Sequence, residues 1–394
     1  MEKSVKKAKT PQIITVVSFV TAIAVLFVLF AVLPKKAGQM SDLEFRKLED
    51  HPIIGKSFST IVSDTVKGDL SKNVDSFLED HFPARNFFIA LNAYYLRLTG
   101  RNADQGIVLG KNGRLFDAAI HPDMEQLDKN IDGVLRFAED NGLALIYVDV
   151  PTSAAVVTED LPDLHLEYHD AEVIAHIRER VSQKGQSVPD LISLYGDDAG
   201  EYFYRTDHHW TMKGAYLCYA AIANDLGITP VKESQFVVTG HEFYGSFYRK
   251  AGLWLTEPDA LEVWRCDETE TMKVTIGSGD KSVEHTGLYD DEQLRTDNVN
   301  KYAAYIYDNN GLTVIENEAG NGETLLVVKD SFGNSIVPLL AMNYSRVVMI
   351  DTREYRDASL PAPSELVNLY GITQMVVVLG TDSSTSNITI GFLR

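Results

Sequence analysis

Two short segments contain residue types that together could perform acyl transfer. They read Tyr204-Arg205-Thr206-Asp207-His208-His209-Trp210-Thr211 and Val327-Val328-Lys329-Asp330-Ser331-Phe332-Gly333-Asn334-Ser335. A serine hydroxyl becomes a nucleophile when an imidazole takes its proton, and the imidazole needs a carboxylate on its other nitrogen. The spacing of Asp207 and His209 lets one turn present both side chains to one site. We therefore expect Ser331 as nucleophile, His209 as base and Asp207 as the orienting acid.

The position predicted for Ser331 suits this chemistry. The apolar run 325–328 predicts a buried strand, and 332–342 has the length and periodicity of a helix. A residue at such a turn lies on the carboxyl edge of the sheet, beside backbone N–H groups that can stabilise an oxyanion. The alternatives are that Ser331 only caps its helix and that Asp207 caps a helix beginning near Thr211. Asp330 faces the wrong way on its strand to be the triad acid, so we expect it to be structural.

The surrounding elements alternate between strands and helices. Apolar runs of strand length occur at 143–150, 324–330, 346–351 and 375–380, and helical patterns at 124–141, 171–184 and 213–226. This alternation predicts an α/β fold with a parallel sheet covered by helices on both faces. Residues 235–320 have a different texture, with alternating polarity at 273–276 and 302–307, and predict a β-rich insertion. Upstream, 106–116 predicts a hairpin, and 70–98 a helix broken at Pro83.

The N-terminal region predicts a membrane anchor. Residues 13–33 contain no charge, and 21 residues at a rise of ~1.5 Å span about 31 Å, the thickness of the bilayer core. Lysines precede this run, so 1–12 is expected to be a cytoplasmic tail and the rest of the chain to lie outside the cytoplasm, in a single-pass arrangement at the cell membrane. Residues 34–69 are expected to form a stalk or arm and 70–394 the extracytoplasmic domain. A cleaved signal peptide is the alternative.

Composition excludes some functions. With 45% hydrophobic and 23% charged residues the chain is globular, and its net charge of −20 argues against nucleic-acid binding. The two cysteines, Cys218 and Cys266, either form one disulfide or are ordinary core residues, and their spacing matches no zinc pattern.

The two segments together resemble the DHHW family and the related alginate O-acetyltransferase family, both with SGNH-hydrolase-like folds. The similarity rests on Asp-x-His-Trp followed by Asp-Ser-Phe. It extends to 80–85, which resembles a D-x-F-P-x-R segment of these families, and to the hairpin at 106–116. The resemblance implies an SGNH-like fold and the same triad, with Asp207 and His209 preceding Ser331 in the chain.

The resemblance also implies further residues near the site. Trp210 is implied to stack on a sugar ring, with core packing as the alternative. Arg353 is implied to bind a substrate carboxylate or phosphate, with a salt bridge to Asp351 as the alternative. The loop at 151–153 lacks the lysine or asparagine that these families carry there, so Gly333 and Asn334 are the substitutes considered as oxyanion donors.

The expected function is an O-acyltransferase, with acetyl as the group transferred to a cell-envelope or exported polysaccharide. No cofactor or metal is expected, and the families imply a multispanning membrane O-acyltransferase as the acetyl supplier. The alternatives are a carbohydrate acetyl esterase and a non-catalytic glycan-binding or scaffold protein. Because 207–209 also reads as a DHH motif, a metal-dependent phosphoesterase is a further alternative, although the N-terminal third offers no D-x-D.

Overall fold

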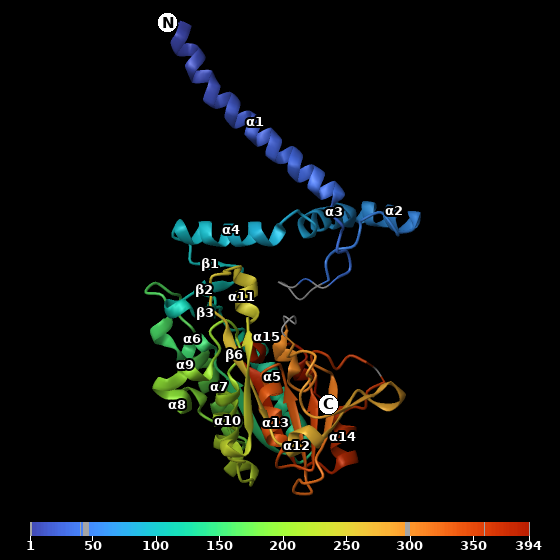
Figure 1. The fold of residues 1–394 in the computed structure, drawn as a ribbon. Coiled ribbons are helices and arrows are strands. Elements are labelled where there is room, and N and C mark those ends of the chain that lie inside the picture. Colours follow the sequence, from blue (N-terminus) through green and yellow to red (C-terminus); the bar gives the residue numbers. More distant parts are fainter. Residues whose placement is uncertain (1, 40, 42–46, 296–299, 358, 394) are drawn as a thin grey trace. The chain divides into compact units, whose positions relative to one another are not determined.

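The computed structural model describes residues 2–39, 41, 47–295, 300–357 and 359–393. The chain divides into two compact units (Figure 1). The first comprises Met1–Arg101 with Arg249–Trp254, and the second Asn102–Tyr248 with Leu255–Arg394. Each unit is described by itself below.

The first unit is helical. Its helices are α1 (Glu2–Val32), α2 (Phe58–Lys67), α3 (Asp69–Asp80) and α4 (Arg85–Leu98). Within α1, Thr10–Val32 has a mean hydropathy of 2.9 and no buried residue, so it is long and apolar enough to cross a membrane. The predicted helix break at Pro83 is confirmed, because α3 ends before it and α4 begins after it. Helix α2 lies within the segment expected to be a stalk or arm.

The segment at 80–85 has a structural role in the first unit. The buried Asp80 carboxylate accepts a hydrogen bond from the Glu49 N–H at 2.8 Å, and the Arg85 guanidinium lies 3.9 Å from it. Ala84, between α3 and α4, has a left-handed backbone with φ 56°. The D-x-F-P-x-R pattern therefore ends one helix, begins the next and attaches the segment near Glu49 to that junction.

The second unit is built on a central mixed sheet. Among the described residues its seven strands have the order β4-β12-β10-β11-β9-β7-β8. Their bounds are Ala144–Val150 (β4), Gln374–Gly380 (β12), Thr324–Lys329 (β10), Arg346–Ile350 (β11), Leu312–Glu316 (β9), Lys273–Ile276 (β7) and Val283–Thr286 (β8). The first four are parallel to one another, as predicted. Each of the last three runs antiparallel to the strands beside it.

Helices cover both faces of this sheet. The longer ones are α5 (Met124–Asp140), α7 (Asp170–Ser182), α10 (Met212–Leu226), α13 (Gly333–Ala341) and α14 (Pro363–Tyr370). Alternate residues of β10, such as Val327 and Val328, belong to different hydrophobic clusters. The Val327 face packs against α10 and α13, and the Val328 face against α5, α7 and α14. This is the three-layer arrangement that continuous apolar strands predict.

Shorter elements complete the second unit. The remaining helices are α6 (Ser153–Val156), α8 (Leu191–Tyr195), α9 (Ala199–Tyr202), α11 (Ser246–Ala251, which continues into the first unit), α12 (Asp267–Thr271) and α15 (Thr381–Ser386). The remaining strands are β1 (Ala103–Asp104), β2 (Ile107–Leu109), β3 (Leu115–Asp117), β5 (Val237–Phe243) and β6 (Asp259–Arg265). Strands β2 and β3 form the predicted hairpin, and β5 pairs with β6.

The region at 235–320 differs from the expectation in two ways. Strands β7, β8 and β9 extend the main sheet, so much of the expected insertion belongs to the core of the domain. The alternating polarity at 302–307 does not correspond to a strand: a 3-10 helix covers Lys301–Ala304, and Ile306, Tyr307 and Asp308 have positive φ angles. Cys218 and Cys266 are both free, and Cys218 is buried.

Candidate active site

Ser331 occupies the predicted turn between β10 and α13. The Asp330 carboxylate accepts hydrogen bonds from the N–H groups of Phe332 (2.9 Å) and Gly380 (2.8 Å), and is buried. Asp330 therefore closes the turn and joins it to the end of β12, which is the structural role expected of it. Each of its two oxygens holds one backbone N–H in this way, and Asp207 is the carboxylate that contacts His209.

Asp207 and His209 lie on a hairpin-like loop between α9 and α10. Phe203 and Trp210 form an antiparallel bridge at its base, and Thr211, not Asp207, caps α10. The buried Arg114 of the 106–116 hairpin donates to the carbonyls of Phe203 and Tyr204, both at 3.1 Å. Thus the hairpin motif supports the backbone that carries the Asp-His pair.

The three predicted residues meet in the structure. His209 Nδ1 lies 2.6 Å from Asp207 Oδ1, and His209 Nε2 lies 2.7 Å from Ser331 Oγ. With Nδ1–H donating to the carboxylate, Nε2 is left to accept the proton of the serine hydroxyl. The serine and histidine are 122 positions apart in the chain, so their contact is a property of the fold. Their catalytic role stays a prediction.

Asp207 is held in its ionised form. Its second oxygen accepts a hydrogen bond from the Ser246 N–H at 2.6 Å, and the His209 N–H donates to Oδ1 at 3.0 Å. Burial alone would raise the pKa of this carboxyl. Electrostatic interaction with His208 and His209, together with these hydrogen bonds, outweighs burial and holds the pKa of Asp207 well below its usual value.

Aromatic rings fix the plane of His209. The Tyr302 ring stacks on it at a centroid distance of 3.8 Å and an angle of 9°, and the His208 ring lies 3.8 Å away at 37°. The Tyr302 hydroxyl donates to the Ser331 carbonyl at 3.2 Å. Tyr302 thus contacts both the base and the serine turn. No sequence motif pointed to Tyr302, whereas His208 is visible in the Asp-His-His run.

A pocket of about 190 Å³ opens at this edge of the sheet. Its lining includes Ser331 and residues that follow the carboxyl ends of β4, β11 and β12, namely Thr152, Ser153, Arg353, Thr381, Asp382 and Ser383. His208 and Phe247 line another part of it. The site therefore lies where parallel α/β sheets place their ligands.

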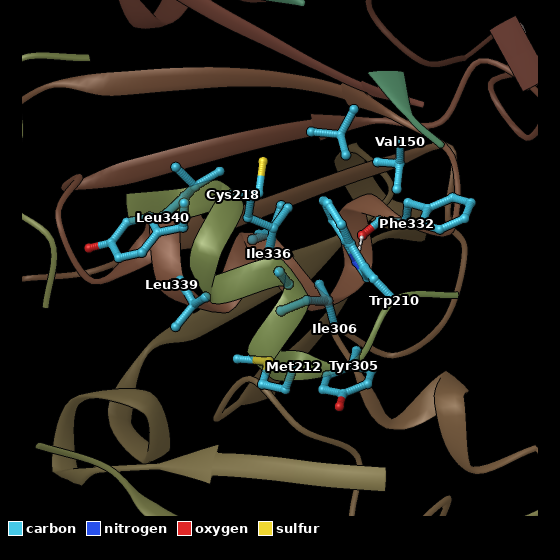
Figure 2. Packing of buried hydrophobic residues seen from close by; sticks show 14 of the residues in the cluster. Val150, Trp210, Met212, Cys218, Tyr305, Ile306, Phe332, Ile336, Leu339 and Leu340 are labelled. Carbon is cyan, nitrogen blue, oxygen red and sulfur yellow. Dashed lines mark hydrogen bonds between the residues drawn. The ribbon is translucent and has the colours of Figure 1, made fainter. Parts of the chain in front are cut away.

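Trp210 is not part of this pocket wall. It is fully buried, and its indole N–H donates to Ser335 Oγ at 2.7 Å. Figure 2 shows its ring among the core side chains Phe332 and Ile336. The core-packing alternative therefore describes Trp210, and the expectation of sugar stacking does not fit its position.

Asn334 is likewise enclosed. It is fully buried, its side-chain oxygen accepts from Lys329 Nζ at 2.7 Å, and its amide donates to Asn309 at 3.2 Å. Its backbone N–H donates to the Ser331 carbonyl, and that of Gly333 to the Asp330 carbonyl. Neither substitute considered as an oxyanion donor is therefore available as placed. The Ser331 N–H, in contrast, has no acceptor within the described part of the chain.

Arg353 lies in the pocket and also forms the alternative salt bridge. Its guanidinium donates to both oxygens of the buried Asp351, at 2.9 and 2.6 Å, and its side chain keeps 32% exposure. The buried Lys329 Nζ lies 3.4 Å from Asp351 Oδ2, and burial lowers the pKa of this lysine. Asp351 thus joins a buried cation to one that faces the pocket.

The geometry of the Asp-His-His run bears on the metal-dependent alternative. The potential ligand atoms of Asp207, His208 and His209 lie within 4.8 Å of one another. Two of these residues are already joined by the 2.6 Å hydrogen bond, and Nε2 of His209 contacts Ser331. This arrangement matches a proton relay more closely than an open metal site, which needs several further ligands.

Gly245 supplies a test of how tightly Asp207 is packed. A Cβ at Gly245 would lie 2.2 Å from Asp207 Cβ and 2.5 Å from the Thr206 carbonyl. We expect Gly245→Ala to lower the free energy of unfolding by about 1–3 kcal/mol, because the backbone must move to relieve this overlap. Denaturant unfolding measures the change. Gly240→Ala is the control, since its Cβ would meet nothing closer than 3.8 Å; equal effects of the two variants would contradict the prediction.

Comparisons with known proteins bear on the family and the fold. The family model for DHHW proteins matches residues 188–350, a range that includes both the Asp-His segment and Ser331. The resemblance to the DHHW family is confirmed. A probable alginate O-acetylase AlgJ of Pseudomonas syringae pv. tomato is 30% identical over 173 residues, 40% of this chain and 43% of the relative. The AlgJ of Pseudomonas fluorescens is 30% identical over 203 residues, 47% of this chain and 50% of the relative. The match thus spans about half the length of these curated relatives.

Solved structures extend the comparison to the fold. A DHHW family protein from Eubacterium siraeum has a TM-score of 0.59 and 20% identity, covering 73% of this chain and 95% of that one. Bacillus cereus PatB1 has a TM-score of 0.58 and 19% identity, covering 73% and 99%. The predicted SGNH-like α/β fold with an N-terminal apolar helix is confirmed.

Proposed function

We propose that this chain is a membrane-anchored, extracytoplasmic O-acyltransferase that moves an acetyl group onto a polysaccharide through Ser331, His209 and Asp207. The observation that carries the proposal is the continuous contact from Asp207 Oδ1 through His209 to Ser331 Oγ, at 2.6 and 2.7 Å, beside a pocket. The alginate O-acetylase relatives support acetyl transfer to a polysaccharide. The apolar helix Thr10–Val32 supports anchoring, with the lysine-rich end in the cytoplasm.

In the first half-reaction His209 Nε2 takes the Ser331 proton while Oγ attacks the acetyl carbonyl of the donor. We assign the Ser331 N–H as the hydrogen-bond donor that stabilises the oxyanion. The bond from the acetyl carbon to the donor's leaving oxygen or sulfur then breaks, and His209 returns its proton to that leaving group. In the second half-reaction a polysaccharide hydroxyl gives its proton to His209 and attacks the acetyl carbon. The bond to Oγ breaks, and the proton returns to Ser331.

The direct test is mass spectrometry of the full chain in detergent after exposure to an activated acetyl ester. We expect one added acetyl group on the peptide that contains Ser331, and none in His209→Ala. An acetyl group found only on lysines, or on Ser331 equally in His209→Ala, would contradict this mechanism.

The same protein separates transferase from esterase. With a chromogenic acetyl ester as donor, a transferase should place acetyl on an added oligosaccharide, and acceptor should lower the acetate released per ester consumed. Release of acetate unaffected by acceptor would favour the carbohydrate esterase. A multispanning membrane acyltransferase as the source of acetyl belongs to this proposal as a partner, and co-purification of the two proteins tests it.

A further inference from the structure

Helix α4 of the first unit exposes an aromatic and aliphatic face. Phe87, Leu91, Tyr95 and Leu98 are 47, 51, 62 and 87% exposed, and their spacing places them on one side of the helix. A helix of a soluble protein normally buries such a face. Among the described residues, this face of α4 remains largely uncovered.

The opposite side of α4 is already occupied by protein. Ala90 and Ala93 are buried, and Gly252 approaches so closely that a Cβ there would lie 3.3 Å from Ile89 Cγ2. From the same short segment, the Trp254 ring contacts the Phe87 ring at 5.8 Å and remains 49% exposed. The helix is thus fixed by its small residues, and its large apolar residues face away from the protein.

The charge of this segment is unusual for the chain. Residues 85–101 contain three arginines and no acidic residue, in a protein whose net charge is −20. Arg85 lies near Asp80, whereas Arg97 and Arg101 are exposed at the carboxyl end of the helix. An amphipathic helix with aromatic residues on one face and arginines at its border is typical of a helix that lies in a lipid headgroup layer.

The unit that contains α4 is also the unit that contains the apolar helix. Phe30, near the end of the span Thr10–Val32, contacts Phe77 of α3 at a ring distance of 6.4 Å. Four residues, 81–84, separate the end of α3 from the start of α4, and four residues span at most about 14 Å. The helix is therefore held close to the point where α1 leaves the bilayer core.

We propose that α4, together with Trp254, lies in the headgroup layer of the membrane that α1 crosses and forms a second, peripheral membrane contact. This proposal does not depend on acyl transfer. The contact restricts the tilt and height of the first unit relative to the bilayer. Anchoring by α1 alone does not restrict them in this way.

Tryptophan fluorescence of the full chain in vesicles tests the proposal. The sequence has three tryptophans, and only Trp254 is exposed, because Trp210 and Trp264 are buried. We reconstitute the protein into phosphatidylcholine–phosphatidylglycerol vesicles with and without lipids brominated near the headgroup end of the acyl chain. We expect roughly half of the Trp254 emission to be quenched, since an interfacial helix inserts its apolar face about 5–10 Å. Trp254→Phe gives the background from the buried tryptophans.

Paired variants identify the contact. Leu91→Asp with Leu98→Asp should reduce the quenching of Trp254 to near zero. Leu164→Asp with Leu166→Asp is the control, because those leucines are 96 and 72% exposed outside α4, and it should leave quenching unchanged. The proposed membrane contact is wrong if Trp254 is not quenched in vesicles that contain no other protein. It is also wrong if Leu91→Asp with Leu98→Asp leaves the quenching unchanged. Protection of Trp254 only when a membrane protein is added would assign the face to a protein partner instead.

Discussion

Ser331→Ala is expected to lower the rate of acyl transfer by about 10⁴- to 10⁶-fold, because loss of a triad nucleophile leaves only binding and oxyanion stabilisation. The fold should be retained. The Ser331 hydroxyl contacts His209 at 2.7 Å and lies at a half-buried position, so its removal should change the free energy of unfolding by no more than about 1 kcal/mol. Steady-state hydrolysis of a chromogenic acetyl ester and thermal unfolding measure the two effects.

Two controls make this result specific. Ser182→Ala removes an exposed serine hydroxyl at the end of α7 and should leave the rate unchanged. The double variant with His209→Ala and Ser331→Ala should be no slower than Ser331→Ala alone, because residues that act as one unit are not additive. A rate within tenfold of wild type for Ser331→Ala would place the nucleophile elsewhere.

The sequence predicted the position of Ser331 because local signals determine it. A continuous apolar strand, a small polar turn and an apolar helix have little freedom in how they connect, and β10 and α13 follow that pattern. One correction was also within reach of the sequence. All nine residues of α13 are buried, and a helix that is apolar all round indicates burial, so Asn334 within it had to be enclosed and paired.

Other features depend on contacts between distant segments. The stacking of Tyr302 on His209 joins two segments that are distant in the chain. Tyr302 lies on the 3-10 helix Lys301–Ala304, which is followed by three consecutive positive φ angles at 306–308. Alternating polarity at 302–307 imitated a strand, yet tertiary packing imposed another backbone. In the same way, β7, β8 and β9 read as an insertion because a sequence does not state which strands pair. Local pattern therefore predicted the elements and the meeting of Asp207, His209 and Ser331, while the walls of the site depend on the three-dimensional structure.

Asp207→Asn is expected to lower the rate by about 10⁴-fold while leaving Ser331 and His209 in the chain. An asparagine has one acceptor oxygen, whereas Asp207 accepts from the His209 ring through one oxygen and from the Ser246 N–H through the other. If the amide oxygen faces Ser246, the amide N–H₂ faces His209 and favours the tautomer with its proton on Nε2. That tautomer cannot accept the serine proton, so His209 remains in place but cannot act as the general base.

The same substitution has a pH signature. The folded-state pKa of Asp207 is depressed, so its charge stabilises the fold above the unfolded value of 3.8, and this stabilisation is lost as pH falls below that value. Wild type should therefore lose more stability than Asp207→Asn between neutral pH and pH about 3, as thermal unfolding at a series of pH values measures. The variant itself should be about 1–3 kcal/mol less stable at neutral pH, because a buried donor loses its acceptor.

A second Asp-His pair provides the matched control. Asp128 Oδ1 lies 2.8 Å from His176 Nε2, with 43 and 31% exposed side chains, and neither residue lines the pocket. Asp128→Asn should keep the full rate and change stability by no more than about 1 kcal/mol, because exposed pairs contribute little. If both variants lose the same activity, the loss reflects general damage to the fold. If only Asp207→Asn is slow, the carboxylate acts through the imidazole, and the short contacts along Asp207, His209 and Ser331 are the path of the proton.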